Sequence, residues 1–214
     1  MSSIAVFFSI VAALAIGAIS PGPSFVLVSR IAVSRSRSAG LAAALGMGAG
    51  GVIFASLALL GLNALLMQVE WLYLGLKIAG GLYLIYLGIR IWRGASEGLA
   101  LDAPASPASM AAGRNFWFGL GTQLSNPKTA IYYGSIFAAL LPADPARGLM
   151  FAVPPAVFLL EAGWYTIVAI AFSSNRPRAL YLRSKRWIDR VAGVVMGALG
   201  ARLVTESLPR HIWR

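Results

Sequence analysis

A single lysine stands deep in an apolar stretch of this chain, where charge is costly. Lys128 directly follows an Asn126-Pro127 step, about a dozen residues into its apolar run. A charge at the centre of a bilayer costs roughly 2.5–3.5 kcal/mol on insertion scales and normally faces a polar interior. Beside a helix N-terminus, whose dipole is also positive, Lys128 would form an anion site suited to a carboxylate. The alternative is snorkelling of its ammonium to the membrane surface.

Two further charged residues are candidates for proton coupling. Glu161 lies thirteen residues past Gly148, about 20 Å along a helix at 1.5 Å per residue. Its carboxylate could carry a proton, or pair with Lys128 or with a substrate ammonium; a purely structural ion pair is the alternative. Lys77 lies about six residues into its apolar run and could snorkel outward. Its helical face would also carry Gly81, Leu84 and Gly88, which would turn it inward.

Two Ser-Pro or Asn-Pro steps, Ser20-Pro21 and Asn126-Pro127, each predict a helix that stops and restarts. Proline breaks a helix that runs into it and disfavours helical dihedrals at the preceding residue. It is favoured as the first residue of a new helix, with Ser or Asn as the cap. Backbone freed inside a membrane survives only beside a cavity or a ligand; a plain proline kink is the alternative. The expected substrate-binding residues are Ser20, Pro21, Gly22, Pro23, Ser24, Gln123, Asn126, Pro127 and Lys128.

Six apolar runs must position these residues. The chain is 58% hydrophobic and 12% charged, with a mean hydropathy of +0.76, whereas globular proteins carry roughly 25% charged residues. In hydrocarbon every backbone amide must be paired internally, so the runs are predicted to be helices. They cover residues 4–29, 39–67, 72–92, 115–141, 148–172 and 188–206.

The basic residues predict an orientation. The chain has a net charge of +11, which in a soluble protein would suggest nucleic acid. Here the first, third and fifth connections hold twelve Lys and Arg residues, against three on the opposite side. Basic loops stay in the cytoplasm, so both termini are expected outside, and the predicted partner is the lipid bilayer and not nucleic acid.

The two halves of the chain resemble each other. Ser20-Pro21 and Asn126-Pro127 are 106 residues apart, and the later Gly40-Leu41 and Gly148-Leu149 are 108 apart. Residues 1–93 and 115–214 would each hold three spans, joined by a cytoplasmic linker at 94–114. Because three is odd, the halves would be inverted, as in many secondary transporters; coincidence is the alternative.

Small residues and missing motifs complete this picture. Gly46 with Gly50, and Gly193 with Gly197, predict close helix contacts. The chain has no cysteine, and neither HExxH nor GxxxxGK[ST] occurs. We therefore expect no metal, no cofactor and no enzymatic activity.

Several segments together resemble the LysE/RhtB family of amino-acid exporters over nearly the full chain. They are residues 20–23, 34–41 with Leu45-Gly46, 77–84 with 86–88, 126–128 and 186–193. The resemblance implies a six-helix fold in the bacterial inner membrane, and export of amino acids or similar solutes coupled to the proton gradient. Two positions depart from the family: Gly51 stands where an Asp is common, and Ser24 where Asn or Asp is frequent. Glu161 lies near the position of the second half that is equivalent to Gly51. It is the candidate to take over alone the role of the missing aspartate.

Together these features predict an all-α, multi-pass membrane protein with broken first and fourth helices. Its expected function is secondary export of a small zwitterion by proton antiport with alternating access. The substrate carboxylate would lie between the two breaks, with its ammonium held by freed carbonyls or by Glu161. A passive channel and a non-transport membrane subunit are the alternatives, and a homo-oligomer is compatible with the sequence. A redox carrier is disfavoured, because related six-helix proteins pass electrons through paired cysteines and this chain has no cysteine.

Overall fold

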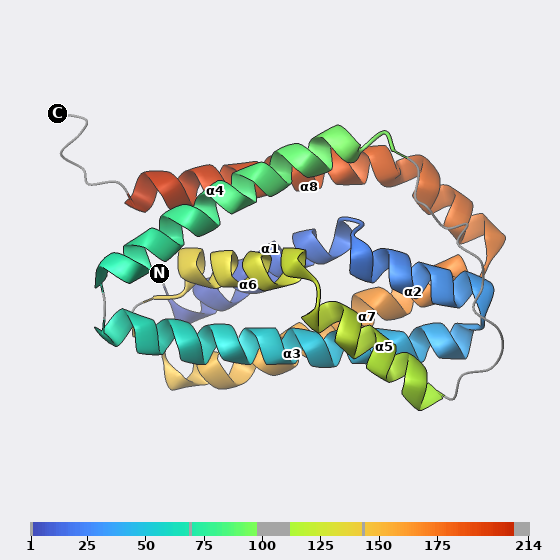
Figure 1. The fold of residues 1–214 in the computed structure, drawn as a ribbon, viewed down its shortest axis with the longest axis horizontal. Coiled ribbons are helices and arrows are strands. Elements are labelled where there is room, and N and C mark those ends of the chain that lie inside the picture. The colour runs from blue at the N-terminus through green and yellow to red at the C-terminus, as the bar shows by residue number, and fades with distance from the viewer. Residues whose placement is uncertain (1, 69, 98–111, 143, 208–214) are drawn as a thin grey trace.

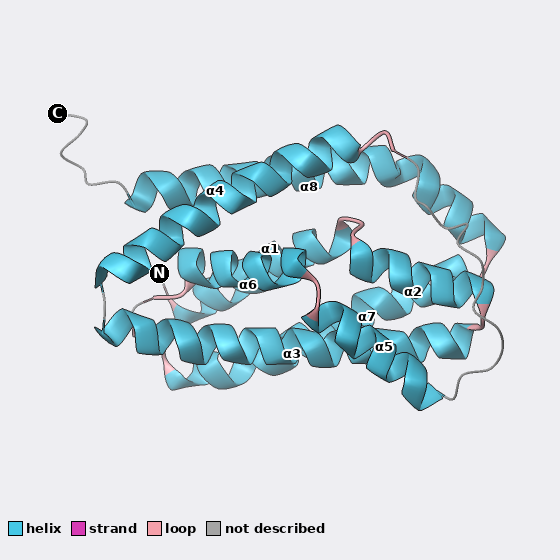
Figure 2. Cartoon of the chain, viewed as in Figure 1, coloured by secondary structure: helices cyan, strands magenta, loops and turns pink. Residues whose placement is uncertain are grey.

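The computed structural model of the chain is a bundle of α-helices (Figures 1 and 2). It describes residues 2–68, 70–97, 112–142 and 144–207, and this part of the chain contains no strand. The predicted all-α class is therefore confirmed. The helices are α1 (Ser3–Ile19), α2 (Pro23–Ser34), α3 (Arg37–Gln68), α4 (Glu70–Gly94), α5 (Ala112–Leu124), α6 (Pro127–Leu140), α7 (Arg147–Phe172) and α8 (Asn175–Ser207).

The helices run back and forth along the long axis of the molecule. In Figure 1, α1 with α2 runs from left to right, α3 returns, and α4 runs to the right again. The second half starts at the right: α5 with α6 runs to the left, α7 to the right and α8 to the left. Among the described residues, α3 and α7 are long and apolar enough to cross a membrane, and α1 with α2 is a third candidate if this pair, bent by 56°, forms one span.

One expected connection is a helix. Residues 173–187 were predicted to lie in a basic cytoplasmic loop, but α8 already begins at Asn175. The stretch contains Ala, Leu, Arg and Lys, which all favour helix, and its proline lies in the first turn, where no helical hydrogen bond is lost. The basic residues thus extend the last helix beyond its apolar part.

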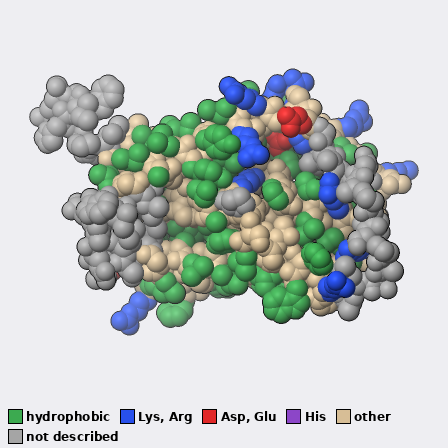
Figure 3. Space-filling view, viewed as in Figure 1, with side chains coloured by type: hydrophobic (Ala, Val, Ile, Leu, Met, Phe, Trp, Pro, Cys, Tyr) green, Lys and Arg blue, Asp and Glu red, His purple; other side chains and the backbone are tan. Residues whose placement is uncertain are grey.

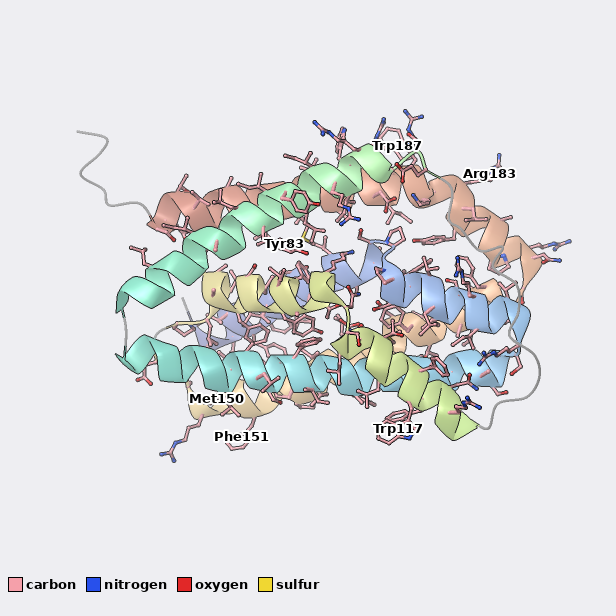
Figure 4. All side chains as sticks on the ribbon, in the orientation of Figure 1. Tyr83, Trp117, Met150, Phe151, Arg183 and Trp187 are labelled. Carbon is pink, nitrogen blue, oxygen red and sulfur yellow. The ribbon has the colours of Figure 1, made fainter. Side chains whose placement is uncertain are left out.

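The surface of the bundle is apolar and part of its interior is polar. On α7, Phe151 is 79% exposed and Leu159 71%, whereas Glu161 is 4% exposed. Figure 4 shows Phe151 and Trp117 pointing away from the bundle. A soluble protein rarely exposes many large apolar side chains while it buries a carboxylate. This distribution is the one expected for a protein surrounded by lipid.

The buried polar residues form a layer between two apolar clusters. Along α3, one cluster contains residues 39–47 and the other contains Ala55 and Leu59. Along α7, the clusters lie on either side of Glu161, at residues 149–157 and 165–172. The break between α1 and α2 lies between the same clusters. The helix breaks and Glu161 therefore occupy one level of the bundle.

Glycines let two helix pairs approach closely, as the sequence predicts for Gly46, Gly50 and Gly193; a Cβ added to Gly197 would meet nothing within 4 Å. A Cβ added to Gly88 of α4 would lie 2.5 Å from the Gly193 carbonyl oxygen of α8. A Cβ at Gly50 of α3 would lie 2.7 Å from the Gln123 side chain of α5. Only a residue without a side chain permits such contacts. Gly50 thereby sets the depth at which α5 presents Gln123 to the polar layer.

Replacing Gly88 should test the α4–α8 contact. We expect Gly88→Ala to lower the free energy of unfolding by about 1–3 kcal/mol, because the new methyl group meets backbone atoms that cannot move away. The matched control is Gly163→Ala in α7, where an added Cβ meets nothing within 4 Å. Thermal unfolding of the purified protein in detergent should give a lower Tm for Gly88→Ala alone. Equal Tm values for both variants would contradict the close packing.

Candidate functional site

The two helix breaks lie against each other through three polar side chains. Ser24, in the first turn of α2, donates a hydrogen bond from Oγ to Oε1 of Gln123 at 2.7 Å. Asn126, at the second break, donates from Nδ2 to the same Ser24 oxygen at 3.1 Å. All three residues are buried. The structure therefore brings together predicted site residues that are about a hundred positions apart in the chain.

Lys128 reaches from the second break to the first. Its Nζ donates to the backbone carbonyl of Ser20 at 3.3 Å. A Cβ on Gly22 would lie 3.3 Å from this Nζ, so a glycine leaves the ammonium free to approach the break. The carbonyl at the end of α1 is thus satisfied by a charged donor. The ammonium has two further N–H groups available for a ligand.

The second break is capped as predicted and the first is not. Asn126 accepts a hydrogen bond from the Lys128 amide at 3.1 Å, with Pro127 at the first turn of α6. At the first break α2 restarts at Pro23 and its N-cap is Gly22, which has no side chain to cap it. Ser20 instead ends α1, and its buried Oγ has no hydrogen-bond partner among the described residues. The cap predicted for Ser20 is therefore wrong, because two prolines two residues apart hold the chain extended through Gly22.

Pro127 cannot donate to the carbonyl of Gln123, four residues earlier, but this carbonyl is satisfied locally. The Gln123 oxygen accepts a hydrogen bond from the Asn126 amide at 3.3 Å. A tight turn therefore repairs this side of the second break. The side chain of Gln123, and not its backbone, faces the site.

Glu161 lies in the same layer, next to the position where the family commonly has an aspartate. The Tyr133 hydroxyl donates to Glu161 Oε1 at 2.8 Å, and the buried Oε2 has no hydrogen-bond partner among the described residues. A Cβ on Gly51 would lie 3.0 Å from Glu161 Cγ and 3.1 Å from the Tyr133 oxygen. Position 51 of α3 therefore contacts the α7 carboxylate directly. Glu161 stands at the place that a side chain at position 51 would reach.

Two of the hollows beside the breaks share lining residues. The larger cavity of these two, of about 400 Å³, extends from Lys128 and the first break to the end of α4 and to Lys185 and Asp189 within α8. The smaller chamber, of about 20 Å³, has room for one water molecule and is lined by Tyr133 and Glu161. Both are lined by Ser20, Gly22, Asn126 and Lys128. The breaks thus form the wall between a ligand-sized cavity and the carboxylate.

The far wall of the larger cavity contains charged residues that the sequence reasoning missed. Arg90 comes from α4, Glu97 from the residues just after α4, and Lys185 and Asp189 from α8. Lys185 Nζ and Asp189 Oδ2 form an ion pair at 2.8 Å. Tyr83, also on this wall, lies between α4 and the helices α1 and α6 (Figure 4). The spacing of Lys185 and Asp189, four residues apart in a helix, was the available signal.

Two predicted site residues are only partly tested. The side chains of Lys77 and Pro127 lie outside the described parts of the structure. Leu84 and Gly88, which share the predicted helical face of Lys77, are buried. Lys77 remains a predicted candidate for proton coupling.

The sequence matches a known family over most of its length. The sequence model of the LysE type translocators matches residues 15–207, which include both breaks, Glu161 and the Lys185–Asp189 pair. The chain belongs to the LysE type translocator family. It is thus a transporter and not an enzyme, as the sequence predicts.

The curated relatives are bacterial membrane proteins of similar length. The threonine efflux protein of Escherichia coli (strain K12) is 37% identical over 186 residues, which cover 86% of this chain and 90% of that protein. The threonine efflux protein of Salmonella typhi is 35% identical over 199 residues, or 92% and 97% of the two chains. An uncharacterized membrane protein of Haemophilus influenzae is 30% identical over 197 residues, or 90% and 92%. No solved structure matches the chain.

Cysteine labelling should test whether the larger cavity admits water. Because the chain has no cysteine, a single introduced thiol can be followed without background. We expect Ile91→Cys, on the cavity wall, to react with a charged methanethiosulfonate in inside-out vesicles. The matched control is Leu84→Cys, two turns earlier in α4 and fully buried in the apolar core, which should stay unmodified. Equal labelling of the two thiols would contradict a water-filled cavity at this place.

Proposed function

We propose that this protein exports a small zwitterionic amino acid from the bacterial cytoplasm by proton antiport. One observation carries the proposal: Lys128 spans two helix breaks at the wall between a ligand-sized cavity and a buried carboxylate. The volume of about 400 Å³ is near the lower end of the 300–1,000 Å³ that is usual for ligand pockets. The threonine efflux relatives support a substrate of that size.

The substrate carboxylate would bind at the two breaks. Lys128 supplies the charge, and the start of α6 directs its positive dipole end to the same place. The hydroxyl of Ser20, which has no partner among the described residues, could donate a further hydrogen bond. The other residues of this site are Pro21, Gly22, Pro23, Ser24, Gln123, Asn126 and Pro127. This arrangement satisfies the remaining donors of Lys128 without placing an uncompensated charge in the membrane.

Glu161 would carry the proton. It takes up a proton when the site faces outward and releases it to the cytoplasm when the site faces inward. The small chamber between Lys128 and Glu161 holds room for one water that could relay it. Protonation of Glu161 and binding of the substrate would thereby be linked, because both involve the residues of the two breaks.

An inverted repeat in the inner membrane would provide the alternating access. We propose six spans: α1 with α2, α3, α4, α5 with α6, α7 and α8. The repeat would relate α1 to α5, α2 to α6 and α3 to α7. Under this relation, the contact of α1 with α7 corresponds to that of α5 with α3, and the contact of α1 with α6 corresponds to that of α5 with α2. The opposite chain directions of the two halves in Figure 1 support the same relation.

The orientation of the protein would follow from its charges. Lys and Arg side chains gather at the right-hand half of Figure 3, around the turn between α2 and α3 and the first half of α8. The described chain begins and ends at the opposite side of the bundle (Figure 1). With the basic side in the cytoplasm, both termini lie in the periplasm. The larger cavity then opens towards the cytoplasm, because it reaches Glu97, just after the end of α4.

Uptake of radiolabelled L-threonine into inside-out vesicles with an acidic interior should test the function. Lys128→Met should lower the rate at least about 10-fold, since a hydrogen bond to a charged group contributes roughly 1.5–3 kcal/mol. Glu161→Gln should retain exchange of internal for external threonine and lose the stimulation by the proton gradient. The matched controls are Arg202→Gln and Glu206→Gln, which alter an exposed ion pair on α8 and should behave as the unmodified protein.

The outcomes separate the alternatives. Full gradient-driven uptake by both Lys128→Met and Glu161→Gln would exclude the proposed site. Uptake by the unmodified protein that neither responds to the gradient nor moves protons would indicate a passive channel. No uptake of L-threonine or of other small amino acids would contradict the proposed function.

A further inference from the structure

The α8 side of the larger cavity carries a carboxylate oxygen that lacks a donor. Asp189 is 3% exposed, and its Oδ1 is buried with no hydrogen-bond partner among the described residues. A buried acceptor left without a partner costs roughly 1–3 kcal/mol, and more when it is charged. Asp189 nevertheless lines the cavity that Lys128 lines from the opposite side. No described residue supplies a donor to this oxygen, so a ligand in the cavity could supply it.

The other oxygen of Asp189 is held in place. Oδ2 accepts from Lys185 Nζ at 2.8 Å, and the same Nζ donates to the Gly94 carbonyl at 3.3 Å. One residue further along, the Arg190 guanidinium lies 5.4 Å from the ring centre of Trp92 and 5.8 Å from that of Trp187. These contacts tie this part of α8 to the end of α4. The unpartnered Oδ1 is thus a fixed acceptor and not a freely rotating one.

The cavity presents opposite charges at opposite walls. Lys128 stands on α6 beside the breaks, and Asp189 stands on α8. The carboxylate and the ammonium are attached to the same carbon in an α-amino acid, so a site with one cation and one free acceptor matches both groups. Lys185, also on the wall, is paired with Oδ2 of Asp189. The remaining charged residues there are Arg90, near the end of α4, and Glu97, just after α4. Neither of them is buried as Asp189 is.

We propose that Oδ1 of Asp189 binds the ammonium of the transported amino acid while Lys128 binds its carboxylate. This assignment rests on the proposed function and replaces Glu161 and the freed carbonyls as the ammonium site. Glu161 is thereby left to carry the proton alone. Asp189 is the residue that distinguishes an amino acid from the corresponding hydroxy acid.

A bound substrate would also connect two parts of the bundle. Both α4 and α8 pack more extensively on each other than on the remaining helices, and their glycines bring the two backbones together. Asp189 belongs to this pair, whereas Lys128 belongs to α6, which follows the second break. A zwitterion held between them links the position of the α4–α8 pair to occupancy of the site.

Competition binding to the purified protein should test the role of Asp189. Bound radiolabelled L-threonine is displaced by unlabelled L-threonine or by its 2-hydroxy analogue, 2,3-dihydroxybutanoate. The unmodified protein should prefer threonine by about 10-fold to 100-fold, the range expected for a hydrogen bond to a charged group. In Asp189→Asn this preference should fall to within about 3-fold, because affinity for threonine drops and affinity for the analogue does not.

Two further variants exclude a structural explanation. Lys185→Gln keeps Asp189 and should keep the preference for threonine. Lys185→Gln with Asp189→Asn removes both buried charges, so that no unpaired ammonium remains, and should lose the preference. An unchanged preference in Asp189→Asn would overturn the proposal, as would equal weakening of both ligands in all three variants. If the unmodified protein binds neither ligand, the proposed function fails, and this inference fails with it.

Discussion

The need to satisfy backbone groups inside an apolar bundle governs this structure. Prolines stop two helices at the same level, between two apolar clusters. Each break exposes polar groups that lipid cannot solvate. The two breaks lie against each other, so that each supplies hydrogen-bond partners for the other. Asn126 donates to Ser24, and Lys128 donates to the backbone carbonyl of Ser20. A solute with a carboxylate can use the same donors, so the stability of the fold and the binding of a ligand have a common physical basis.

Glycines determine how close the surrounding helices come to this layer. Gly50 brings α3 against α5 next to Gln123, and Gly51 brings α3 against Glu161 and Tyr133. A larger side chain at either position would push the helices apart or fill the small chamber. Gly88 plays the corresponding role between α4 and α8, which hold the far wall of the cavity. The polar layer therefore depends on small residues as much as on charged ones.

The two breaks could be predicted from neighbouring residues in the sequence. Features that depend on contacts between distant residues could not. Asn126 before Pro127 supplies a side-chain cap, and the helix does restart there. The same proline rule would also break α7 at Pro154 and Pro155, yet α7 is continuous, because Val153 offers no capping oxygen and packs in the apolar core. Charge alone identified Lys128 and Glu161. Asp189 entered only as part of the family segment 186–193, since nothing in its sequence neighbourhood shows that it lines the same cavity as Lys128.

The central claim is that the carboxylate of a bound amino acid lies at Lys128. The chain contains three lysines, so the protein can be labelled with ¹⁵N at every lysine Nζ and the Lys128 signal assigned with a Lys128→Arg variant. Solid-state NMR in lipid should then detect dipolar dephasing of that signal by L-threonine carrying ¹³C in its carboxyl group. Dephasing of the Lys128 signal alone is the predicted result. No dephasing at Lys128, with the ligand demonstrably bound or with dephasing at another lysine, would contradict the account.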